Sequence, residues 1–118
     1  MAEHRTFESG ATRNAADHKH DFEGFISVPA LRAYGAYMHG HRALADGSQR
    51  DSDNWQQGIP LDAYMKSLLR HVIDVWELHR GGAPINPDNG ELVTMDEALC
   101  GVLFNAFGYL HETVKPVS

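Results

Sequence analysis

The chain of 118 residues is long enough for one domain with a hydrophobic core and too short for two. Its net charge of −6 argues against a general nucleic-acid binder or a protein that coats anionic membranes, because such proteins are usually basic. The single cysteine, the lack of an apolar leader and the absence of any apolar run of about 18 residues predict a cytoplasmic protein without a membrane span.

The N-terminal residues 1–24 carry many charges and no helical periodicity, so we expect an extended arm before a helical body at 25–118. The segment DFEGF at 21–25 places two aromatic residues among acids. Such a segment favours anchoring over a free tail. We therefore expect residues 7–25 to lie against the body, with Phe22 and Phe25 buried.

A first helix is expected over residues 29–42. Ser27 suits the N-cap, and Pro29 suits the first turn because its missing N–H would have no partner there. Leu31, Tyr34 and Met38 then recur at spacings of three and four, which is the periodicity of a helix. The long polar stretch that follows, up to residue 59, is of a kind that is often functional.

A second helix is expected over residues 60–80, ending at Gly81 and Gly82. Tyr64 and Val75 lie well off its main apolar stripe, so a second side should be partly buried too. His71 lies beside this second side. The main stripe consists of Leu61, Met65, Leu68, Leu69, Val72 and Trp76.

A third helix is expected over residues 95–114, because Thr94 and Glu97 form a capping-box pattern before an apolar run. This helix is apolar on most sides. Glycine costs about 1 kcal/mol inside a helix, so two glycines on one face indicate close approach of a neighbouring helix or of a ligand. The narrow polar and glycine stripe consists of Glu97, Gly101, Asn105, Gly108 and Glu112.

These elements predict an all-α fold, a small bundle of about three main helices preceded by the extended arm. Helices that are apolar nearly all round cannot bury their surfaces within one three-helix chain. A symmetric homo-oligomer, in which the second and third helices pair across a two-fold axis, is therefore expected.

A divalent-metal site is one interpretation of His71, Asp74 and Glu97. Two ligands one turn apart, facing a carboxylate on the next helix, is how helical bundles build metal sites. Imidazole suits zinc, whereas carboxylates suit magnesium or manganese. The alternative is that His71 and Asp74 hydrogen-bond to each other and that Glu97 is only a capping residue. Glu77 and Asp96 are reserve ligands.

A second candidate set would bind phosphates or a base. Trp55 could stack on a base while Asn54 hydrogen-bonds to its edge, and Asn105 lies in the polar stripe of the third helix. The alternatives are ordinary solvated charges and a tryptophan that plugs the bundle. The basic members of the set are Arg13, Lys19, Arg50 and Arg70.

The remaining reactive residues are interpreted as structural. The pairs His18/His20 and His39/His41 have metal-like spacing only on an extended segment, so we interpret them as solvent histidines. Cys100 lies in an apolar helix without an obvious base, which is typical of a core thiol.

Several stretches resemble a family of small phage and prophage proteins similar to the dATP/dGTP diphosphohydrolase, N-terminal domain. The most specific part is the NW-x-x-G loop at Asn54, Trp55 and Gly58, followed by Arg70 and His71. The resemblance extends over about residues 6–112. It is carried by FESGATRNAADHKHDFEGFISVPAL, YMHGHR, DGSQRDSDNWQQGIPLDAYMKSLLRH and EALCGVLFNAFGYLHE.

The resemblance implies removal of pyrophosphate from purine deoxynucleoside triphosphates with a divalent metal, in the cytoplasm of a bacterial host. It also invites comparison with the all-α MazG-like pyrophosphohydrolases, which carry E-x-x-E and E-x-x-D on two helices. This chain departs from that pattern, with His71 and Asp74 on one helix and adjacent Asp96 and Glu97 on the next.

Two functions follow as hypotheses. The first is a metal-dependent nucleoside triphosphate pyrophosphohydrolase with its pocket between the second and third helices and the 50–58 loop as its rim. The second is a non-catalytic phage accessory protein that binds a nucleotide or a host protein. Hydrolysis predicts metal-dependent turnover, whereas a binder predicts saturable binding without product.

Overall fold

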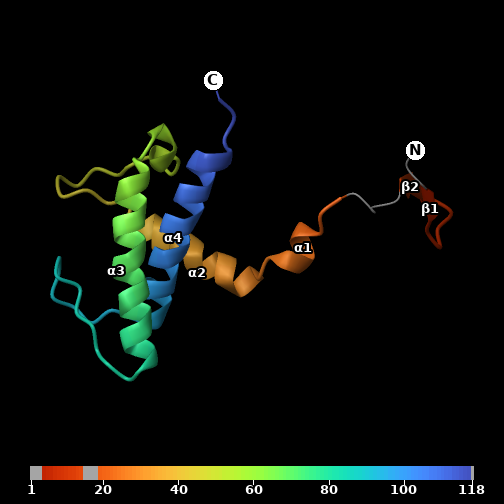
Figure 1. The fold of residues 1–118 in the computed structure, drawn as a ribbon. Helices are drawn as coiled ribbons and strands as arrows, with labels where there is room; N and C mark the ends of the chain where they lie inside the picture. The colour runs from red at the N-terminus through yellow and green to blue at the C-terminus, as the bar shows by residue number, and fades with distance from the viewer. Residues whose placement is uncertain (1–3, 15–18, 118) are drawn as a thin grey trace.

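The computed structural model describes residues 4–14 and 19–117, so His18 of the first histidine pair lies outside the described residues. The body is all-α, as the periodicity predicted, and a short β-hairpin at the N-terminus is the exception (Figure 1). The expected helices at 29–42, 60–80 and 95–114 are confirmed to within about two residues. The elements are β1 His4–Thr6, β2 Thr12–Asn14, α1 Phe22–Phe25, α2 Val28–Gly40, the 3₁₀ turn η1 Asn54–Gln57, α3 Leu61–His79 and α4 Met95–Val114.

Local signals set the helix ends. The Ser27 side chain accepts a 3.2 Å hydrogen bond from the Ala30 amide at the start of α2. Thr94 caps α4 in the same way, through the Glu97 amide at 3.2 Å. At the end of α3, Gly81 adopts a positive φ of 88°, which glycine reaches without the steric cost that a Cβ would add.

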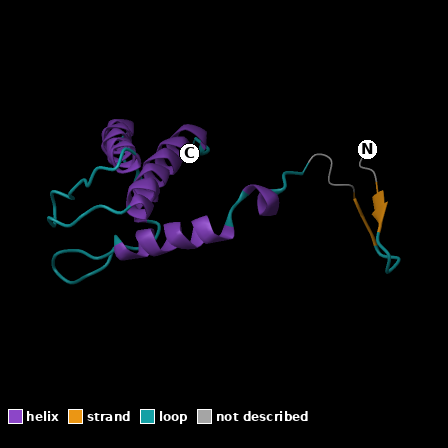
Figure 2. Cartoon of the chain, turned by 90° about the horizontal axis from the view of Figure 1, so that it is seen from below, coloured by secondary structure: helices purple, strands orange, loops and turns teal. Residues whose placement is uncertain are grey.

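The arrangement of the helices is a close pair with a third helix laid against it. α3 and α4 run side by side, and α2 packs against α4 on one side of the pair (Figures 1 and 2). The core is small: Tyr64, Ala98 and Cys100 are the buried hydrophobic residues of the described ranges. Cys100 is therefore the buried thiol that its sequence context predicted. No helix of those ranges is both long and apolar enough to cross a bilayer.

Two bare glycines let α3 approach α4. The ring of Tyr64 lies against Gly108, and the ring of His71 lies against Gly101. A Cβ at either glycine would overlap the ring that faces it. The close approach that the glycine stripe predicted is therefore made by side chains of the neighbouring helix.

In the described part of the arm, α1 does not pack on the body, and the expectation that Phe22 and Phe25 are buried was wrong. Their side chains are 69% and 73% exposed. α1 is a single turn capped by Asp21, and the extended backbone of Ile26, with φ −110° and ψ 127°, separates it from α2. The segment consequently leads away from the helices (Figures 1 and 2).

Candidate functional site

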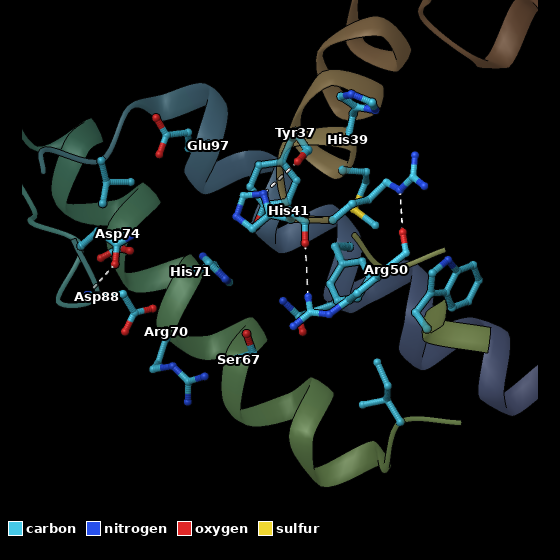
Figure 3. A pocket seen from close by; sticks show the side chains of 18 of the residues that line it. Tyr37, His39, His41, Arg50, Ser67, Arg70, His71, Asp74, Asp88 and Glu97 are labelled. Carbon is cyan, nitrogen blue, oxygen red and sulfur yellow. Dashed lines mark hydrogen bonds between the residues drawn. The ribbon is translucent and has the colours of Figure 1, made fainter. Parts of the chain in front are cut away.

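A cavity of about 1020 Å³ lies where the C-terminal half of α2, the loop before α3, the inner face of α3, the turn at 85–88 and α4 meet (Figure 3). This is the upper end of the volume range of small-molecule sites, about 300–1,000 Å³. Most of the residues predicted to be functional line it. They are Arg50, Asn54, Trp55, Arg70, His71, Asp74, Glu97 and Asn105.

Hydrogen bonds between the two ends of the 41–50 loop position Arg50. Its amide donates to the Arg42 carbonyl at 2.8 Å, and Arg42 Nε donates back to the Arg50 carbonyl at 2.7 Å. Arg50 Nη1 donates to the His41 carbonyl at 3.2 Å (Figure 3). The guanidinium is thus held at the cavity, and among the described residues most of its five donors have no protein partner.

The base-binding candidates sit on the 3₁₀ turn η1. Asn54 and Trp55 both line the cavity, and the indole packs edge-on against His111 of α4, with ring centroids 4.9 Å apart. The sequence left open whether Trp55 stacks on a ligand or plugs the bundle. In the structure Trp55 lines the cavity, and its indole packs against α4 through His111.

His71 is the half-buried centre of the site. Burial lowers the pKa of its imidazole, and the charges of Arg70 and His41 lower it further, while Asp74 acts in the opposite direction. The ring is therefore mainly neutral at pH 7 and retains one nitrogen lone pair. Within the described residues, no hydrogen bond joins it to Asp74, so that alternative is not realised in this structure.

Carboxylates gather on one side of the cavity. Asp74 of α3, Asp88 of the following turn and Glu97 of α4 lie on that side, with His71 beside them (Figure 3). Thr94 caps the backbone amide of Glu97, not its carboxylate. In the described part of the chain, no three histidine, cysteine or acidic side chains are already close enough to share an ion.

Three of the predicted ligand-binding residues are placed differently from the rest. Arg13 lies in strand β2 and Lys19 just before α1, both on the arm and neither at the cavity. Asn105 does line the cavity but is only 3% exposed, and its Nδ2 donates to the Gly101 carbonyl at 2.7 Å. Its amide group therefore supports α4 itself.

Sequence reasoning missed several lining residues. Asp88 was hidden in a run of turn-forming residues, and Ser67 was noted only as lying one turn before His71. His39 and His41 are exposed, as expected of solvent histidines, yet both line the cavity. Their position at the end of a predicted helix was a signal for this placement. The loop that follows α2 reverses direction there, and the Arg50 amide bonds to the Arg42 carbonyl.

The comparisons with known proteins add no relative. A scan of protein-family models finds none that matches this chain, and searches of curated proteins and of solved structures find no match either.

Proposed function

We propose that the chain is a metal-dependent pyrophosphohydrolase of nucleoside triphosphates, with purine deoxynucleotides as the substrate class. One observation supports this most: three arginines, four carboxylates, the neutral imidazole of His71 and a tryptophan line a single cavity. Cations suit the phosphates, carboxylates and imidazole suit a divalent ion, and an aromatic face suits a base.

Each group has a separate role in this proposal. Arg50 and Arg70 bind phosphate oxygens, since guanidinium can bind them in a bidentate manner. Trp55 stacks on the base, and Asn54 hydrogen-bonds to its edge. Water attacks a phosphorus of the α–β bridge, the bridging P–O bond breaks, and the products are a nucleoside monophosphate and pyrophosphate.

The donor chemistry of His71, Asp74 and Glu97 fits a divalent ion, with Asp88 as a further oxygen donor. Magnesium or manganese suits the carboxylates best, and zinc would make more use of the imidazole. A bound divalent ion neutralises phosphate charge and makes a nearby water more acidic. Because these side chains are not yet arranged around one point, we propose that the triphosphate completes the set of oxygen ligands.

The test is release of pyrophosphate from dATP and dGTP by purified protein with manganese or magnesium. Glu97→Gln and Asp74→Asn should lower turnover at least tenfold, because each removes a proposed ligand. Asp62→Asn is the matched control on α3, because Asp62 lies outside the cavity, and it should leave turnover unchanged. Turnover that is indifferent to both cavity variants contradicts the proposal.

A second candidate is a non-catalytic nucleotide-binding protein. The anchoring of Arg50 by the His41 carbonyl favours it, because a prepositioned cation binds an anion without any chemistry. Calorimetry that shows saturable binding of dATP, together with no release of pyrophosphate in the presence of magnesium, manganese or zinc, would favour the non-catalytic function.

A further inference from the structure

The outer side of α3 carries an unpartnered apolar stripe, here called the α3 stripe. Its residues follow at spacings of four, four, three and four, which is the periodicity that helices use to pair with other helices. α3 turns its other side, with Tyr64 and His71, toward α4. The exposed fractions along the stripe are Leu61 40%, Met65 41%, Leu69 55%, Val72 40% and Trp76 64%.

The single chain exposes more surface than a folded monomer should. Its accessible area is 9638 Å², whereas a monomer of 13.1 kDa exposes about 6,400 Å². Its radius of gyration is 19.5 Å, against about 13–14 Å for a domain of this length. The arm accounts for part of this excess, and the uncovered helices account for another part.

α4 extends the apolar surface of the pair. Val102, Ala106 and Tyr109 lie about a quarter to a third of a turn from the glycines that face α3, on the side of α4 opposite Cys100 and Phe104, and they are half-buried or exposed. Two adjacent helices about 30 Å long and 10 Å wide present roughly 600 Å² in projection, and the accessible area of such a face is larger. A standard interface removes about 800 Å² from each partner, so this face is close to the size that a stable dimer needs.

We propose that the α3 stripe and the adjoining face of α4 are covered by the same face of a second copy of this chain, with the two α3 helices antiparallel. A core of three buried hydrophobic residues leaves the chain dependent on a partner from the moment it folds. A second molecule of the same chain is always present at the same concentration as the first. An isologous contact also satisfies both exposed faces at once.

Charges beside the stripe agree with the antiparallel arrangement. Asp62 and Arg80 lie on one flank of α3, near opposite ends, and Lys66 and Glu77 lie on the same flank further in. An antiparallel pair centred near residue 71 places Lys66 beside Glu77 of the second copy, and Asp62 beside Arg80 of the second copy. A parallel pair would instead place each of these residues beside its own copy.

Sedimentation equilibrium of the purified protein should give twice the chain mass. Leu69→Glu should abolish the dimer, because it buries a charge in the interface. Leu92→Glu is the matched control, since this leucine is 64% exposed in a loop away from the α3 stripe, and it should leave the dimer intact. Lys66→Glu should weaken association severalfold, and Lys66→Glu combined with Glu77→Lys should restore it.

Trp76 gives a readout that does not depend on disrupting the interface. In Trp55→Phe it is the one remaining tryptophan. A blue-shifted emission that resists quenching by iodide is expected if a second copy covers the indole. A monomer with a freely quenched Trp76, or an assembly that Leu69→Glu leaves intact, overturns the proposal. A charge swap that fails to restore association overturns the antiparallel pairing.

Discussion

The imidazole of His71 fills the space that a side chain at Gly101 would take. A Cβ built on residue 101 would lie 2.5 Å from His71 Nδ1, closer than real Cβ contacts allow. The missing side chain in α4 thus sets both the spacing of the two helices and the position of the proposed metal-ligating ring. Stability and site geometry depend on the same contact.

Gly101→Ala should lower the free energy of unfolding by up to about 2 kcal/mol. Overpacking costs about 1–3 kcal/mol, and the gain in helix propensity offsets up to about 1 kcal/mol of it. Gly35→Ala is the matched control, because a Cβ there meets nothing within 4 Å inside α2, so it should be neutral or stabilising. Urea unfolding at pH 7 measures both. Equal effects of the two variants would show that α3 and α4 are not held this closely.

Tyr64→Phe should be neutral or should raise the free energy of unfolding by up to about 1 kcal/mol. Tyr64 is 1% exposed, and its hydroxyl has no hydrogen-bond partner among the described residues. A buried polar group without a partner is unfavourable, so its removal relieves a cost. Thermal unfolding measures the change, with the half-buried Tyr34→Phe as a control. A loss above 1 kcal/mol would show that the hydroxyl is hydrogen-bonded in solution.

The stability of the fold should fall as the pH drops below about 6.5, the usual pKa of histidine. Burial lowers the pKa of His71 in the folded chain, so the unfolded chain takes up a proton first. The contribution of His71 is complete above its unfolded pKa and is lost as the pH falls toward its lower folded pKa. Urea midpoints at pH 7, 6 and 5 should therefore fall less steeply in His71→Asn than in the wild type. Parallel curves would contradict this linkage.

The helices could be predicted because their signals are local. Ser27 and Thr94 cap α2 and α4 with the hydrogen bonds that the sequence indicated, and Gly81 ends α3. The glycines at 101 and 108 also predicted a close approach. Sequence alone could not choose between a helix and a ligand, because that choice depends on which side of α3 faces α4.

The arm could not be predicted, because the position of Phe22 depends on long-range contacts that no local pattern specifies. Two aromatics among acids are compatible with an anchor or with an exposed segment. For the site, residues on regular helices such as His71 and Asp74 were found by spacing. Asp88 and His41 were missed because irregular backbone brings them to the cavity.

Phe22→Ala and Phe25→Ala should each change the free energy of unfolding by less than about 0.5 kcal/mol, as is usual for exposed positions. A buried phenylalanine would cost about 3–5 kcal/mol on the same substitution. Urea unfolding at two protein concentrations measures this effect. A large loss at both concentrations would show that the arm packs on its own body, and a loss that varies with concentration would show that it packs on another copy.

Affinity for a triphosphate should depend on Arg50 far more than on a cation elsewhere on the chain. Arg50 is fixed at the cavity by its bond to the His41 carbonyl, whereas Arg32 is exposed on α2 and does not line the cavity. Hydrogen bonds to charged groups contribute about 1.5–3 kcal/mol, so Arg50→Ala should weaken dATP binding roughly 10- to 100-fold. Arg32→Ala removes an equal charge and should weaken binding less than threefold, through long-range electrostatics alone. Calorimetry with dATP in the absence of metal separates phosphate binding from turnover. Equal losses in the two variants would mean that only net charge attracts the nucleotide and that the cavity does not bind its phosphates.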